Sequence, residues 1–95
     1  MLFVGSTGGR RPAADLALAA ALTAALPAMV RSLALELAPV RVNLIAAGAA
    51  GGETAGQAGI AALAVHLMTN TAITGAAIDI DGGQQLISEG EQWRP

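Results

Sequence analysis

The hydrophobic pattern at the start of the chain predicts a short strand followed by a long helix. Leu2-Phe3-Val4 is an apolar run that leads into a glycine-rich stretch over residues 5–9, as a strand entering a loop does. Residues 13–37 are rich in Ala and Leu and contain no Gly, which favours one continuous helix. Apolar residues at three- and four-residue steps form one stripe along it: Leu22, Leu26, Met29, Leu33 and Leu37.

Two local features refine the expectation for this helix. Pro27 lacks an N–H group, so we expect a kink or a junction there. The side opposite the stripe is mostly Ala, so the helix is apolar nearly all round and is expected to be covered on more than one side. Asp15 is expected in the first helical turn, where a carboxylate favours the positive end of the helix dipole.

The rest of the chain predicts two more strands around a second helix. Residues 40–46 are rich in β-branched residues and lack strict alternation, which is typical of a strand covered on both faces. Residues 48–59 contain five glycines and are expected to form a loop, whereas residues 60–68 have apolar positions at helical spacing. Residues 76–80 predict a last strand, closed by a turn at Asp81-Gly82-Gly83. The order β-α-β-α-β predicts an α/β fold with a three-stranded parallel sheet, one long helix and one shorter helix.

Composition narrows the kinds of partner. The chain is 54% hydrophobic and only 13% charged, more apolar than a small globule can hide, so an oligomer or a missing partner segment is expected, and the partner we predict is a homo-oligomer. A net charge of −2 and the lack of Lys argue against nucleic acid. The chain has no Cys and a single His, His66, so no metal site is expected. The uncharged run over residues 16–30 is shorter than the about 20 residues of a membrane span, so we expect no membrane contact and a cytoplasmic location.

Four short stretches occur along the chain in a distinctive order. They are Phe3-Val4-Gly5-Ser6, residues 31–39, Arg41-Val42-Asn43 with the turn up to Gly48, and Thr74-Gly75 with residues 79–83. This series resembles the carboxyl-terminal half of the short-chain dehydrogenase/reductase family, over residues 2–87. The resemblance implies a partial Rossmann-like domain at residues 1–87, followed by a polar tail at residues 88–95. It also implies NAD or NADP as the cofactor.

Of the three catalytic residues that the family uses, the resemblance finds one in this chain and finds the other two replaced. Ser6 corresponds to the family's catalytic serine, which lies at the end of the first of these strands. The family's tyrosine, which exchanges a proton with the substrate carbonyl, and its assisting lysine correspond to Ala19 and Thr23. The chain contains no Tyr and no Lys, so the family's usual proton transfer is not expected.

Cofactor-binding residues are implied only for the turn after the second strand. In the family this turn approaches the nicotinamide, and here it holds Ala47, Gly48 and Ala50. The family usually has Pro-Gly where this chain has Ala47-Gly48, and it usually has Thr where Gly52 stands. The chain has no G-x-G-x-x-G turn, so the main pyrophosphate site of a dinucleotide fold is not in this sequence.

Two functions follow from these observations. By family resemblance the chain is nominally an NAD(P)-dependent oxidoreductase, expected to be inactive as an isolated chain. The alternative is a non-catalytic structural or oligomerisation module that uses the long Ala-rich helix and the last strand. Whether the chain is an enzyme at all is left open by the sequence.

Overall fold

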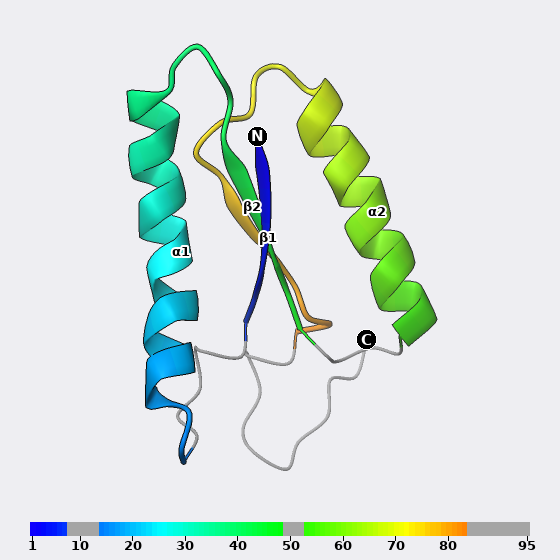
Figure 1. Cartoon of the computed structure of the whole chain (residues 1–95). Helices are drawn as coiled ribbons and strands as arrows, with labels where there is room; N and C mark the ends of the chain where they lie inside the picture. Colours follow the sequence, from blue (N-terminus) through cyan, green and yellow to red (C-terminus); the bar gives the residue numbers. More distant parts are fainter. Residues whose placement is uncertain (8–13, 49–52, 84–95) are drawn as a thin grey trace.

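The computed structural model describes residues 1–7, 14–48 and 53–83, with side chains in the second helix described from residue 56. It contains β1 (Leu2–Ser6), α1 (Ala17–Glu36), β2 (Asn43–Ala47), α2 (Glu53–Thr69) and β3 (Ala77–Ile80). The strands form one sheet in the order β1-β2-β3, and both neighbouring pairs are parallel. The two helices lie on opposite faces of this sheet (Figure 1). The predicted fold class is therefore confirmed.

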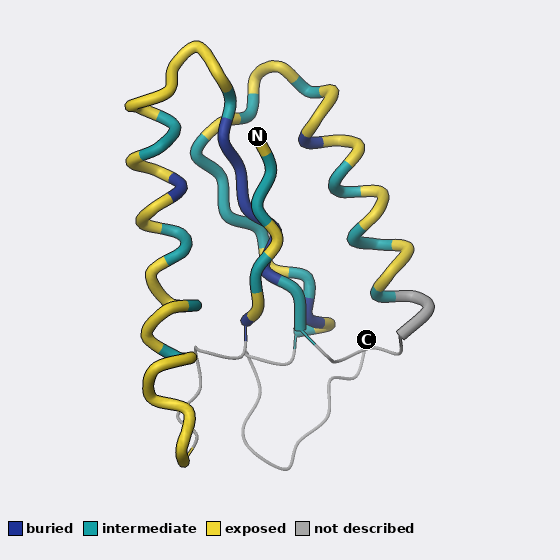
Figure 2. The backbone as a smooth tube through the Cα atoms, viewed as in Figure 1, coloured by how far each residue is buried: buried dark blue, intermediate teal, exposed yellow. Residues whose placement is uncertain are grey.

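The centre of the structure is β2. Its residues from Asn43 to Ala46 are buried, because β1 and β3 flank the strand and a helix covers each face (Figure 2). This explains why the sequence here lacks alternation. The core groups Val30 of α1 with Val42 and Leu44, and Phe3 and Leu26 pack against these residues.

Helix α1 packs on the sheet along a single face, which corrects the expectation that it is covered on more than one side. Val30 is its only buried residue, and Leu18 and Leu22 are 74% and 63% exposed. The sheet-facing stripe passes through Leu26, Val30 and Leu33 at helical spacing, so the predicted stripe is correct at Leu26 and Leu33 only. By length and composition alone, α1 could also cross a membrane.

The start of α1 also differs from the prediction. The helix begins at Ala17, after a turn in which Asp15 has a φ of +65°. That backbone conformation lies in the left-handed region and is incompatible with a right-handed helix, so Asp15 is not in the first helical turn. Pro27 lies inside α1 without ending it.

Helix α2 starts at Glu53, well before the predicted residue 60. The loop predicted over residues 48–59 is thus helical from residue 53, and Gly56 and Gly59 lie within the helix. A glycine costs a helix only about 1 kcal/mol relative to Ala, so a helix of this length tolerates two of them. In the strands, β1 extends through Gly5 and Ser6, and β2 begins at Asn43 rather than at residue 40.

Candidate functional site

The carboxyl ends of the three strands meet at one edge of the sheet. Ser6 is paired with Ala47, and Ala47 with Ile80. Beyond these pairs the Thr7 N–H group donates to the Ala47 carbonyl at 3.1 Å, and the Gly48 N–H group donates to the Ile80 carbonyl at 2.8 Å. The ladder thus brings three segments of the chain to the edge where open parallel α/β sheets bind ligands.

Three residues form the centre of this edge, and we call Thr7, Gly48 and Asp81 the carboxyl-edge cluster. Thr7 and Asp81 are only 8% and 5% exposed. A Cβ atom on Gly48 would collide with the Asp81 side chain and would lie 2.8 Å from Thr7 Oγ1. Only glycine therefore fits between the Thr7 hydroxyl and the Asp81 Cβ atom.

The turn after β3 fixes the Asp81 carboxylate. The Gly83 N–H group donates to Asp81 Oδ1 at 2.9 Å. Gly82 and Gly83 have φ values of +66° and +79°, which favour glycine. The Asp-Gly-Gly segment is therefore a turn, as predicted. Asp79, two residues earlier, is exposed whereas Asp81 is buried, so the two carboxylates have different environments.

The catalytic candidate Ser6 is the last residue of β1 and is exposed. The hydroxyl inside the carboxyl-edge cluster belongs instead to Thr7. Sequence reasoning did not single out Thr7. Alternation along an extended chain shows that Ser6 and Thr7 face opposite sides, but it does not say which of them faces the cluster. The assignment of Ser6 remains a prediction.

The candidate cofactor residues are placed only in part. Ala47 ends β2, and Gly48 follows it inside the cluster; both are half-buried. Ala50 lies outside the described residues, as does Gly52. Cofactor binding by these residues remains a prediction.

The two positions that lack the family's chemistry both lie on α1. Ala19 is exposed and has no group that exchanges protons. The Thr23 hydroxyl donates to carbonyl oxygens of its own helix, 2.9 Å to that of Ala19 and 3.2 Å to that of Ala20. Thr23 therefore serves the local backbone and brings no positive charge to the sheet edge.

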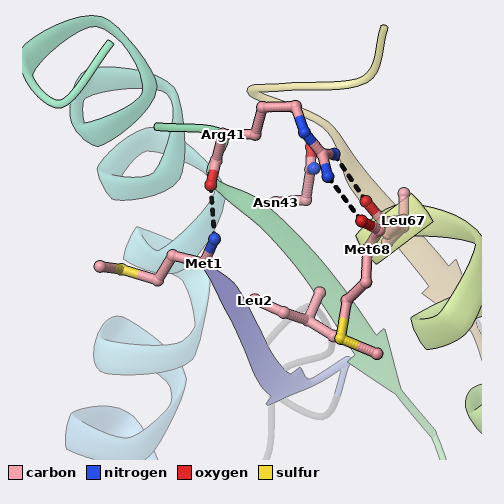
Figure 3. A pocket seen from close by; sticks show the side chains of 6 residues that line it. All are labelled: Met1, Leu2, Arg41, Asn43, Leu67 and Met68. Atoms are coloured by element: carbon pink, nitrogen blue, oxygen red, sulfur yellow. Dashed lines mark hydrogen bonds between the residues drawn. The ribbon is translucent and has the colours of Figure 1, made fainter. Parts of the chain in front are cut away.

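The opposite end of the sheet is held by Arg41. Its Nη1 atom lies 2.6–3.1 Å from the carbonyl oxygens of Leu67, Asn70 and Ile73, and its Nη2 atom donates to that of Met68 at 2.7 Å. The guanidinium thus satisfies carbonyls at the end of α2 that have no partner inside the helix (Figure 3).

A small hollow of about 120 Å³ lies at this end of the sheet. Its lining residues are Met1, Leu2, Arg41, Asn43, Leu67 and Met68. It is far along the strands from the carboxyl-edge cluster, and Arg41 is already bonded to backbone there. Among the described residues, no group of three or more His, Cys, Asp and Glu side chains could hold a metal ion.

The fold and the carboxyl-edge cluster define half of a Rossmann-like domain, and comparison with known proteins names the family. The family of SDR-like Rossmann domains, that is, of short-chain dehydrogenases/reductases, matches residues 1–62. The chain therefore belongs to the short-chain dehydrogenase/reductase family. No curated protein matches it.

Solved structures agree with this assignment. A small-chain dehydrogenase is 36% identical, with a TM-score of 0.76 over 90% of this chain and 43% of its own. A small-chain dehydrogenase in complex with NADPH is 26% identical, with a TM-score of 0.70 over 90% of this chain and 51% of its own. A short-chain dehydrogenase/reductase of Serratia marcescens is 28% identical, with a TM-score of 0.71 over 88% and 44%. The chain thus spans about half the length of these proteins.

Proposed function

We propose that this chain is a relative of NAD(P)-dependent oxidoreductases that retains the shape of the substrate and nicotinamide end of the fold and does not itself catalyse carbonyl reduction. The observation that supports the proposal most strongly is the identity of two residues on α1. Where the family has its proton-transferring pair, this helix has an exposed Ala19 and a Thr23 whose hydroxyl bonds to its own backbone. Reduction of a carbonyl needs a proton at its oxygen as well as a hydride at its carbon, and neither residue supplies that proton.

The cofactor proposal is limited to one end of the dinucleotide. One solved relative is in complex with NADPH, which supports a nucleotide cofactor for the family. In this chain, Ala47 and Gly48 would face the nicotinamide, the ring that supplies the hydride when the cofactor is bound. The sequence has no G-x-G-x-x-G turn for the pyrophosphate, where a dinucleotide makes many of its strongest contacts. We therefore expect binding weaker than millimolar.

Titration of the purified chain with NADH and NADPH tests this proposal. Cofactor fluorescence is expected to show no saturation below millimolar concentration, and NADPH oxidation with a panel of aldehydes and ketones is expected to equal that of buffer. Saturable micromolar binding would show that a cofactor site is complete without the pyrophosphate turn. Turnover of any carbonyl would refute the loss of catalysis.

A second function, assembly of copies of this chain in the cytoplasm, is favoured by the outer side of α1. Leu18 and Leu35 are exposed there, Leu22 is exposed at its margin one turn before Leu26, and the residues between them are mostly small Ala. Small residues let two helix backbones approach closely, so this side suits packing against the same helix of a second copy, and β3 offers a further edge.

Sedimentation from micromolar to submillimolar concentration tests assembly. A dimer or larger species is expected, and Leu22→Glu on α1 is expected to dissociate it. Val65→Glu, at a 56% exposed position on α2, is the matched control and should leave the assembly intact. A monomer at every concentration would refute the assembly function.

A further inference from the structure

The side chain of Asn70 lies between a histidine and the turn that joins α2 to β3 (Figure 1). Its Oδ1 atom accepts from the Ala72 N–H group at 3.1 Å, and its Nδ2 atom lies 3.4 Å from His66 Nε2. A backbone N–H group can only donate, so Ala72 determines which end of the Asn70 amide is the oxygen. The NH₂ group of the amide therefore faces the imidazole in the last turn of α2.

This orientation of the amide defines which form of the imidazole it can bond to. The NH₂ group of Asn70 can only donate, so His66 Nε2 has to accept, and the proton of the neutral ring is then on Nδ1. A protonated imidazole carries an N–H group on both nitrogens and would place a donor against a donor. The contact between His66 and Asn70 therefore belongs to the neutral ring.

Rotation of the Asn70 amide by half a turn would restore a contact with the protonated ring. The Oδ1 atom would then accept from His66 Nε2, in a bond that the charge of the ring strengthens. The NH₂ group would face the Ala72 N–H group instead, and two donors cannot form a hydrogen bond. Protonation of the ring therefore exchanges the bond between Asn70 and the turn for a bond between Asn70 and His66.

The backbone of Asn70 is held by bonds that do not depend on the imidazole. Its N–H group donates to the His66 carbonyl at 2.8 Å, and its carbonyl accepts from Arg41 Nη1 at 2.9 Å. The residue is thus anchored at the end of α2, and the side-chain amide is the part that can rotate.

The charged groups near the end of α2 are cationic among the described residues. They are the Arg41 guanidinium and the Met1 amino group, which donates to the Arg41 carbonyl at 2.6 Å. Glu36 ends α1 on the opposite face of the sheet (Figure 1). No described carboxylate on the α2 side thus competes with the Asn70 oxygen for a protonated His66.

We propose that His66 and Asn70 form a pH-sensitive switch, in which protonation of the imidazole rotates the Asn70 amide and releases the Ala72 N–H group. The switch acts on the turn that connects α2 to β3. The residue after Ala72 is Ile73, whose carbonyl accepts from Arg41 Nη1 at 3.1 Å, so the released segment is the one that Arg41 holds. Histidine side chains change charge in the range of about pH 5 to 8, which sets the range of the test.

Nuclear magnetic resonance of the ¹⁵N-labelled chain between pH 8 and pH 5 tests the switch. The ¹⁵N shifts of the His66 ring report its tautomer and its protonation, and hydrogen exchange reports the protection of the Ala72 amide relative to an unstructured peptide at the same pH. The expected result is the Nδ1–H tautomer at high pH. Protection of Ala72 is expected to fall about fivefold as the ring gains its proton, the effect of one lost hydrogen bond.

Two variants separate the switch from a general effect of pH. His66→Gln keeps an acceptor for the Asn70 NH₂ group but does not titrate, so Ala72 protection should not change with pH. Asn70→Asp has an acceptor oxygen on both sides, so Ala72 should stay protected when the ring is charged. Constant Ala72 protection in the parent chain while the His66 ring titrates overturns the proposal, as does an equal fall in His66→Gln. These readouts use neither cofactor nor activity, so they are independent of the proposed function.

Discussion

The two ends of the parallel sheet are built in different ways. At the amino end, hydrogen bonds from side chains to backbone hold the elements together. Arg41 binds four carbonyl groups, and the Thr74 hydroxyl accepts from the Val42 N–H group at 3.1 Å. At the carboxyl end, close packing around Gly48 sets the geometry. The comparison shows that residues that maintain the fold can identify the family, even where the catalytic pair is absent.

Asn43 shows how closely the motif at the amino end serves the fold. Its side chain is 2% exposed, donates to the Ile73 carbonyl and accepts from the Ala76 N–H group, both at 3.0 Å. The amide thereby ties the start of β2 to the segment that leads into β3. Arg41 does the same for the end of α2. The Arg-Val-Asn motif is thus a structural connection between three elements and does not contact the candidate site.

The largest expected effect comes from breaking the amino end at Arg41. Arg41→Met keeps much of the apolar stem and removes all four hydrogen bonds, so we expect a loss of about 3 kcal/mol in the free energy of unfolding. In a chain this small, such a loss would unfold much of the population in buffer. Urea denaturation followed by far-UV circular dichroism measures it.

The control for Arg41 is Arg31→Met on α1. Arg31 is exposed, so its replacement is expected to change stability by less than about 0.5 kcal/mol. Arg41→Lys should fall between the two, because an ammonium group keeps the charge but cannot reproduce the planar fork. Equal denaturation midpoints for Arg41→Met and Arg31→Met would show that the amino end is not held by these hydrogen bonds.

At the carboxyl end, Gly48→Ala is expected to cost about 2 kcal/mol, because the new methyl group overlaps the Asp81 side chain and crowds Thr7 Oγ1. Both neighbours are buried and have little room to move. Gly5→Ala is the matched control: its methyl group would lie 2.5 Å from Leu26 Cδ1, the end of a flexible side chain. A smaller loss is therefore expected at Gly5, and thermal unfolding of the two variants ranks them. A larger loss at Gly5 would contradict the packing assigned to Gly48.

The same contrast explains what the sequence could predict. Burial of β2 leaves a direct mark on composition, so a strand covered on both faces could be predicted. The alternation of strands and helices predicted the parallel sheet, and Asp81-Gly82-Gly83 predicted the turn. Partners far apart in sequence leave no such mark. Arg41 lies close in sequence to the end of α1, yet its guanidinium donates to the carbonyl groups of Leu67 and Met68 in α2, 26 and 27 residues away. Nothing local in the sequence indicates that the end of α2 lies beside it.

Other differences arise where tertiary structure overrides local preference. The outer side of α1 is apolar like a buried helix, and the described chain leaves it exposed. At the candidate site, the resemblance pointed to Ser6, and only the strand register shows that the neighbouring Thr7 lies in the cluster. Register is a property of two strands together, so the residue that faces the site could not be fixed from either strand alone.

The smallest expected effect comes from replacing a glycine that the fold tolerates, in contrast to Gly48, which the fold requires. Gly59 lies inside α2, and a Cβ atom there would meet nothing within 4 Å. Gly59→Ala is therefore expected to stabilise the chain by about 0.5–1 kcal/mol, because Ala loses less backbone entropy on entering a helix. Gly56→Ala, equally open, should act in the same direction, and thermal unfolding should place both variants above the parent and Gly48→Ala below it. A loss of stability at Gly59 would mean that α2 is not a regular helix there, since no neighbouring atom opposes the added methyl group.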